Sequence, residues 1–183
     1  CYIFDKKFPE MAPSHNTILA FTRNVCGSMD YTPVTFSDNN NPHKTTMGHE
    51  LALSVVFESG WTHFADGVKG YRSAPDFVKQ YLREVPVVWD EMRFLAGEPG
   101  RLAVIARRNG NDWYVGGING EDAAKPLKLS LDFLDGNGWT AHLITDGAAP
   151  REFAQKTWDV DRSAPFAVEL KPFGGFALQL RRK

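Results

Sequence analysis

The hydrophobic pattern changes its period near residue 86, and this change limits the possible folds more than any other feature of the chain. Before that point, apolar residues recur at three- and four-residue steps, in helices separated by short apolar runs. After it, apolar and polar residues alternate, as they do in β-strands. The first part predicts three helices and two strands, over residues 17–26, 28–31, 46–58, 61–65 and from Ser73 to about Glu84. Asn16 is the expected N-cap of the first helix, and Gly27 is expected to end it.

The order helix, strand, helix, strand, helix indicates parallel strands joined by right-handed crossovers. Two such short strands are too few for a stable parallel sheet, which needs more strands and a cover on both faces. We therefore expect residues 1–88 to be the C-terminal part of a (β/α)8 barrel, whose other strands come from polypeptide upstream of residue 1. The chain begins at Cys1 with neither an initiator methionine nor a signal peptide, which also leads us to expect a fragment.

Residues 89–183 are expected to form an antiparallel β-sandwich, because many short strands follow one another at close spacing. Gly, Asn, Asp and Pro turn residues separate eight candidate strands, at 87–95, 102–107, 113–119, 127–131, 139–145, 157–160, 166–170 and 176–180. Trp113, Tyr114, Trp139 and Trp158 lie on these strands. Such aromatic side chains either fill the core or stack on sugars, and we favour the core.

Charge and cysteine content exclude several classes of partner. The net charge is −1 and the isoelectric point about 6.6, so nothing in the electrostatics favours nucleic acid or an acidic membrane. No run of about 18 apolar residues is present, and no membrane span is expected. Cys1 and Cys26 form no disulfide framework and show no CxxC spacing.

Three stretches resemble the C-terminal part of glycoside hydrolase family 97, which contains α-glucosidases and α-galactosidases of the starch-utilisation type. They are HNTILAFTRNVCGSMDYTP, TTMGHELALSVVFESG with HFAD, and WDEMRFLAGEPGRLAVIARRNGNDWYVGGING. The resemblance covers nearly the whole chain and is strongest over 15–66 and 89–119. It implies an N-terminal β-super-sandwich, a catalytic (β/α)8 barrel and a C-terminal β-sandwich, of which this chain is the last part.

The resemblance also implies the chemistry. Family members hydrolyse a terminal α-glucosidic or α-galactosidic bond of an oligosaccharide or glycoside with a pair of carboxylates, beside a calcium ion. The main carboxylates are expected on strands before Cys1, so the isolated chain is expected to be inactive and to need the N-terminal remainder of the barrel. The family further implies a periplasmic or secreted protein.

One position departs from the family pattern. Many members have Pro-Glu-His before the helix, with the glutamate in the calcium and catalytic cluster, whereas this chain reads Pro13-Ser14-His15. A serine cannot replace a carboxylate as general acid or as a strong calcium ligand. Either the arrangement differs in this branch, which we favour, or Glu10 reaches the metal from the preceding loop.

The barrel architecture places functional side chains at the carboxyl ends of strands. Asp30 and Tyr31 close the first predicted strand and Asp66 closes the second, so both acids are candidates to bind one sugar. The alternatives are a turn or cap role for Asp30 and an Asx turn for Asp66, which precedes Gly67.

Three residues that open the first helix or lie in it are further candidates for substrate binding. His15 either binds a sugar hydroxyl or packs against Phe21, and Asn16 either binds sugar or serves only as an N-cap. Arg23 lies off the apolar stripe, so it either pairs with a barrel carboxylate or is simply exposed.

His49 and Glu50 lack the second histidine of an HExxH zinc site, and we expect them to be polar residues on the outer surface of a helix. Three classes of function stay open at this point. The chain is part of a glycoside hydrolase, a noncatalytic carbohydrate-binding or interdomain β-sandwich module, or a remnant that folds only in part.

Overall fold

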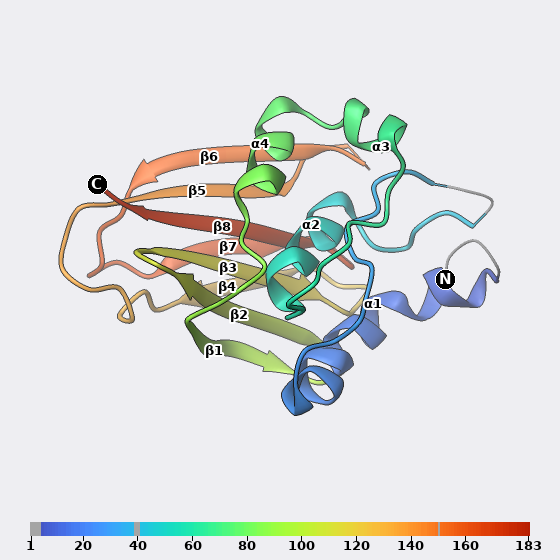
Figure 1. Ribbon diagram of the computed structural model, residues 1–183, viewed down its shortest axis with the longest axis horizontal. Coiled ribbons are helices and arrows are strands. Elements are labelled where there is room, and N and C mark those ends of the chain that lie inside the picture. The colour runs from blue at the N-terminus through green and yellow to red at the C-terminus, as the bar shows by residue number, and fades with distance from the viewer. Residues whose placement is uncertain (1–4, 39–40, 150) are drawn as a thin grey trace.

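The computed structural model describes residues 5–38, 41–149 and 151–183, so Cys1 lies outside it. It has three layers: a two-stranded sheet, a six-stranded sheet, and a layer of helices and extended segments (Figure 1). The helical elements are α1 (Lys7–Phe21), the short 3-10 helix η1 (Arg23–Cys26), α2 (Met47–Val56), α3 (Val68–Ser73) and α4 (Asp76–Glu84).

The predicted strands of the C-terminal half are all present, and every pairing is antiparallel. The six-stranded sheet has the order β1-β2-β3-β8-β5-β6, and β4 pairs with β7 in the smaller sheet. The bounds are β1 (Glu91–Glu98), β2 (Leu102–Asn109), β3 (Asp112–Asn119), β4 (Lys125–Leu129), β5 (Trp139–Asp146), β6 (Phe153–Asp159), β7 (Phe166–Leu170) and β8 (Gly175–Arg182). The predicted starts at 87 and 157 were wrong by four residues for the two edge strands, β1 and β6. Both edge strands are largely exposed, so burial imposes little alternation on them.

The core of the sandwich lies between the two sheets. Trp113 and Trp139 are 4% and 3% exposed there, and Trp158 stacks on Phe166 at its margin. Tyr114 points to the opposite face of the six-stranded sheet, where it is equally buried. The expectation that these aromatic residues serve as core is therefore confirmed, as is the antiparallel sandwich.

The second face of the six-stranded sheet is covered by α2, which lies against β3 and β8 (Figure 1). Glycines allow this close approach. A Cβ atom on Gly116 of β3 would lie 2.8 Å from the carbonyl oxygen of Ala52, and a Cβ on Gly48 would overlap the carbonyl oxygen of Gly175. Leu51 and Val55 of α2 then fill the space against the sheet.

The strands predicted at 28–31 and 61–65 are extended segments without a regular strand ladder, so their assignment as strands was wrong. Their direction agrees with the prediction, because the Met29 N–H donates to the Glu58 carbonyl at 2.9 Å and the Ala65 N–H donates to the Pro33 carbonyl at 2.9 Å. The two segments therefore run side by side in parallel. A ladder needs further strands, and none of the described residues supplies one beside them.

The first helix differs most from its prediction. It begins at Lys7, about ten residues early, and the chain continues as η1 after Phe21. Asn16 is therefore an interior residue of α1, and its predicted N-cap role was wrong. Pro13 lies inside the helix, and the residues before Asn16 have little apolar periodicity, so the pattern gave no sign of the true start.

The other helices follow the predictions more closely. α2 lies within its expected range, and α4 ends as expected but begins at Asp76, because Ser73 belongs to α3. The Thr46 hydroxyl caps α2 by accepting a hydrogen bond from the His49 N–H, and no side chain caps α4. The short helix α3 was not predicted. In the part of the chain that the structure describes, no helix has the length and apolar character needed to cross a bilayer.

Candidate functional site

The two parallel segments present one exposed face and one buried face. Side chains alternate along them, so Met29 and Tyr31 turn toward α2 while Asp30, Trp61 and His63 are exposed. The Trp61 and His63 rings lie 5.3 Å apart. Together with Asp30 they line a cleft of ≈ 510 Å³, whose walls are completed by Ser28, Met29, Ser59 and Gly60. An exposed indole beside a carboxylate and an imidazole is a set of groups suited to stacking on a sugar and binding its hydroxyls.

Asp66 lies outside this cleft. Its carboxylate accepts hydrogen bonds from the N–H groups of Phe36 (2.8 Å), Ser37 (2.9 Å) and Gly67 (2.7 Å), and from the Ser37 hydroxyl. Burial alone would raise its pKa, but these hydrogen bonds together lower it. Asp66 thus fastens the end of one extended segment to the other.

The backbone register separates the two acids that we expected to share one sugar. Asp30 lies one residue after Met29, which bonds to Glu58, whereas Asp66 bonds to Phe36 and Ser37 further along. Asp30 and Asp66 are therefore at different levels of the paired segments. Of the two, only Asp30 lines a cleft with Trp61.

Tyr31 and Arg23 both make internal contacts. The Tyr31 ring packs edge-on against Phe57 at 4.9 Å, and burial, with a smaller effect of the Glu50 charge, raises its pKa to about 12. The exposed Arg23 guanidinium donates to the carbonyls of Ser28 (3.1 Å) and Gly27 (3.5 Å), and so ties η1 to the extended segment that follows.

A buried histidine joins three parts of the molecule. His49 is fully buried, with Nδ1 3.1 Å from the Phe173 carbonyl and Nε2 3.1 Å from Nδ2 of Asn16. Because a carbonyl only accepts, Nδ1 carries the proton and Nε2 accepts from the Asn16 amide. Burial lowers the pKa of His49 to about 4, so the ring is neutral near pH 7. His15, the neighbour of Asn16, is only half-buried.

Glu50 is buried beside His49, so the expected surface role of this pair was wrong. Its carboxylate accepts from the Thr45 hydroxyl (2.6 Å) and the Thr35 N–H (3.3 Å), and burial raises its pKa. α2 is covered on one side by the sheet and on the other by the extended segments, which leaves no outer surface for these two residues.

Glu10, the weak candidate for a calcium ligand, is exposed on α1. It lines a separate cleft with Lys6 and Lys44, whose positive charges oppose cation binding. Within residues 5–38, 41–149 and 151–183, no three His, Cys, Asp or Glu side chains gather in a way that would hold a metal ion. The described residues alone do not fit a calcium site.

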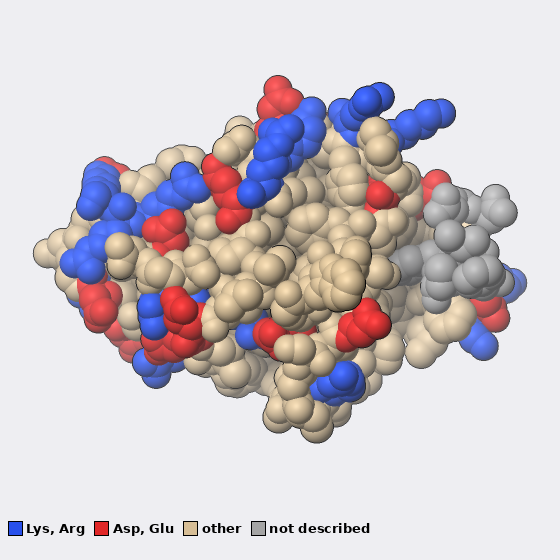
Figure 2. Space-filling model, viewed as in Figure 1, with Lys and Arg blue, Asp and Glu red and all other residues tan. Residues whose placement is uncertain are grey.

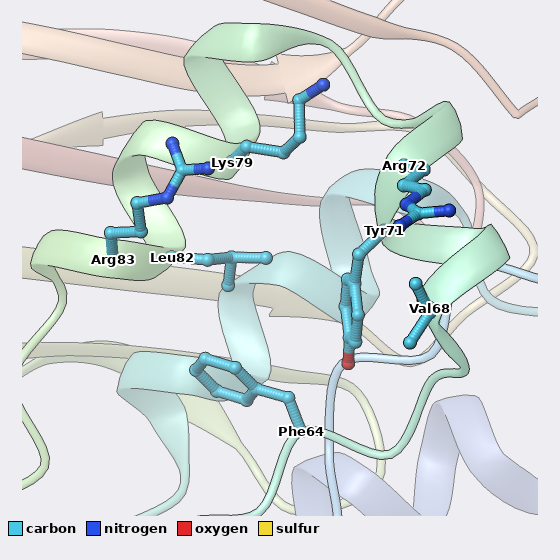
Figure 3. A pocket seen from close by; sticks show the side chains of 7 residues that line it. All are labelled: Phe64, Val68, Tyr71, Arg72, Lys79, Leu82 and Arg83. Atoms are coloured by element: carbon cyan, nitrogen blue, oxygen red, sulfur yellow. The ribbon is translucent and has the colours of Figure 1, made fainter.

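A third cleft, of ≈ 390 Å³, lies between the segment around Phe64 and helices α3 and α4 (Figure 3). Its floor is apolar, and its rim carries the cations Arg72, Lys79 and Arg83. Figure 2 shows basic side chains gathered over the same two helices. Lys79 pairs with Asp76 at 2.8 Å, so part of this charge is balanced locally.

Two residues that connect the halves of the chain were missed in the sequence. Asp146, at the end of β5, accepts from the Thr46 hydroxyl (2.8 Å) and the Gly48 N–H (2.7 Å), and so caps the start of α2. Arg151 donates to the Phe36 carbonyl. Both partners lie about 100 residues away in sequence, and no local pattern marks such a contact.

Comparisons with known proteins agree with this architecture. The family model described as "Glycosyl-hydrolase 97 C-terminal, oligomerisation" matches residues 88–181. A probable retaining alpha-galactosidase of Streptomyces bingchenggensis is 37% identical over 167 residues, which are 89% of this chain and 25% of that protein. The retaining alpha-galactosidase of Bacteroides thetaiotaomicron is 32% identical over 181 residues, covering 91% of this chain and 27% of its own length.

Solved structures match over almost the whole chain. A beta-arabinopyranosidase superposes with a TM-score of 0.89 at 27% identity, over 97% of this chain and 29% of its own. A glycoside hydrolase family 97 enzyme from Pseudoalteromonas sp. strain K8, solved with acarbose, gives a TM-score of 0.84 at 32% identity, over 96% and 30%. The chain spans about a quarter of the length of the curated relatives it matches. Because the family model covers more than half of the residues and its β-sandwich is present, this chain belongs to glycoside hydrolase family 97 and corresponds to its C-terminal part.

Proposed function

We propose that this chain is the C-terminal part of a retaining α-galactosidase, which hydrolyses terminal α-galactosidic bonds of oligosaccharides or glycosides. The observation that carries the proposal is the 37% identity to a probable retaining alpha-galactosidase over 89% of the chain. α-Glucosides are the second substrate class to be tested, because the family resemblance includes both.

The parallel pair formed by the segments around 29–33 and 58–65 supports a place in a barrel. We propose that residues 1–88 are the closing units of a (β/α)8 barrel and that 89–183 are the sandwich that follows it. The upstream polypeptide would contribute the other strands and the two reacting carboxylates. For a retaining enzyme, these carboxyl groups stand about 5–5.5 Å apart, one as nucleophile and one as acid and base.

In this proposal Asp30 is the residue of the chain that binds substrate directly, because its carboxylate is exposed in the cleft beside Trp61. A charged acceptor binds sugar hydroxyls, and the indole packs on the apolar face of the ring. The other candidates serve as positioning residues, since their polar groups contact neighbouring parts of the chain or are partly buried. They are His15, Asn16, Arg23, Tyr31 and Asp66.

We also propose that the full-length protein binds calcium and that it is periplasmic or secreted. Calcium needs several oxygen ligands. Since the described residues do not gather such a set, the ion would be held mainly by upstream carboxylates, with Glu10 as the one candidate from this chain. No catalytic step of this chain is assigned to it. A periplasmic or secreted location follows from the family resemblance alone.

The test compares the full-length protein with the isolated chain on p-nitrophenyl α-galactoside and p-nitrophenyl α-glucoside. We expect turnover of the galactoside by the full-length protein and none by the isolated chain. Proton NMR of the first sugar released should show the α-anomer. A full-length protein inactive on both substrates, or an active isolated chain, contradicts the proposal.

A second function is supported for the sandwich itself. The matching family model carries the word oligomerisation and covers residues 88–181, so we propose that the sandwich promotes self-association. A carbohydrate-binding role is less well supported, since Trp113 and Trp139 are buried and cannot stack on a ligand.

A further inference from the structure

The exposed apolar residues of the sandwich are confined to one place. Among the described residues of the stretch 88–181, the large hydrophobic side chains that are exposed are Val88 (62%), Met92 (53%) and Phe94 (54%). All three lie in or just before β1, at one edge of the six-stranded sheet. We call these three residues the edge patch.

The position of β1 explains why the edge patch is uncovered. Met92 pairs in register with Arg107 and Phe94 with Ile105, so both side chains point to the face of the sheet that α2 covers. α2 lies over the central strands β3 and β8 and leaves the edge strand open. Phe21, at the end of α1, contacts the patch, with its ring 5.6 Å from that of Phe94.

The charges around the patch neutralise one another. Arg108 lies 3.2 Å from Glu91 and 3.5 Å from Asp90, and Arg93 pairs with Glu91. The rim therefore holds two acids and two bases. A neutral rim does not repel an identical rim, and an apolar centre within a polar rim is the usual composition of a protein interface.

We propose that the edge patch is the surface through which this chain contacts a second copy of itself. The inference rests on the self-association role proposed for the sandwich and assigns that role to Val88, Met92 and Phe94. A two-fold arrangement fits best, since the same patch then serves both copies and the assembly closes. Contact through side chains is favoured over a continuous sheet, because a register shift between Phe94 and Ala96 disturbs the edge of β1.

The first test measures the mass of the full-length protein by light scattering after size-exclusion chromatography. We expect the wild type to have at least twice the protomer mass. The variant Met92→Asp/Phe94→Asp should show about a two-fold lower mass, because carboxylates would be buried at the contact. The matched control is Val68→Asp, an apolar side chain of similar exposure on α3, which should leave the mass unchanged.

A second measurement keeps the test valid if the double variant fails to fold. A photoreactive p-benzoylphenylalanine in place of Met92 should crosslink two copies on irradiation. The proposal is overturned if the wild type is monomeric or if a folded double variant keeps the wild-type mass. It is also overturned if the crosslink forms only to upstream residues of the same chain.

Turnover of p-nitrophenyl α-galactoside, measured on the same samples, tests the hydrolase proposal separately. A wild type that assembles but shows no turnover, together with a double variant of lower mass, supports the edge patch and contradicts the hydrolase proposal.

Discussion

His49 shows how burial fixes the protonation of a single side chain. Its two ring nitrogens bond to Phe173 and Asn16, so one imidazole connects α2 to the loop before β8 and to α1. A proton added to Nε2 would face the donor amide of Asn16 and would place a charge in a fully buried site. The neutral ring is therefore part of the folded structure.

This leads to a prediction on pH. The folded pKa of His49 is about 4 and the ordinary value is 6.5, so between these values the unfolded chain binds the extra proton. The stability that His49 contributes is complete above pH 6.5 and is lost as the pH falls toward 4. His49→Gln keeps an amide in place but does not titrate. Urea unfolding should show the wild type losing roughly 3 kcal/mol relative to His49→Gln between pH 7 and 4. A constant difference would contradict the assignment.

Asp66 and Asp30 make a matched pair for testing structural and binding roles. Asp66→Ala removes the acceptor of three backbone N–H groups and should lower the free energy of unfolding by about 1–3 kcal/mol. Asp30→Ala removes an exposed carboxylate and should change the free energy of unfolding by less than about 0.5 kcal/mol.

Kinetics of the full-length protein should separate the two roles. Asp30→Ala should raise KM for the galactoside about tenfold, since the proposed charged hydrogen bond to the substrate would be lost. An unchanged KM would remove Asp30 from the substrate site.

The candidate site was only partly predictable from the sequence, because tertiary packing decides which of its side chains are exposed. The exposure of Asp30 and the buried position of Tyr31 depend on which way each segment faces, and that is decided by packing against α2. The Asx-type role of Asp66 was foreseen as an alternative because Gly67 follows it. The three-way contact of Asn16, His49 and Phe173 joins distant residues and leaves no local signature.

At the scale of elements, the contact of α2 with the sheet depends on glycine. Gly116→Ala would place a methyl group 2.8 Å from the Ala52 carbonyl and 3.0 Å from Val55, so the helix must shift. We expect a loss of roughly 1–3 kcal/mol in the free energy of unfolding, measured with urea. Gly60→Ala is the control, since no atom lies within 4 Å of the added group, and its effect should stay within about 0.5 kcal/mol. Equal effects for the two variants would refute the close-approach argument.

Helices and strands that depend on neighbouring residues were predicted well, and those that depend on distant partners were not. The eight sandwich strands were predicted because alternation and turn residues are properties of neighbouring positions. α1 was placed too late, since Pro13 and the weak pattern before Asn16 hide its first turns. The segments at 28–31 and 61–65 have strand-like sequences, but a regular ladder requires partners that the described chain does not supply.

For the whole molecule, the boundary near residue 88 does not separate two independent cores. Val34 and Leu51 from the first part share one buried cluster with Tyr114, Ile144 and Ala177 from the sandwich. We predict that the 183-residue chain unfolds in a single cooperative transition.

A fragment of residues 89–183 should expose that cluster and bind the dye ANS. Two well-separated transitions in the intact chain, or a fragment that binds no dye, would contradict this prediction.

The contact between Gly48 and Gly175 has a consequence for how proteins of this family diversify. Because a helix of the first part lies directly on a strand of the second, neither part can be exchanged by recombination without carrying both glycines and the Asp146 cap with it. Chimaeras that join this sandwich to the first part of another protein should fold only when the junction is placed upstream of Thr46. The two halves are thus expected to have been inherited as one unit.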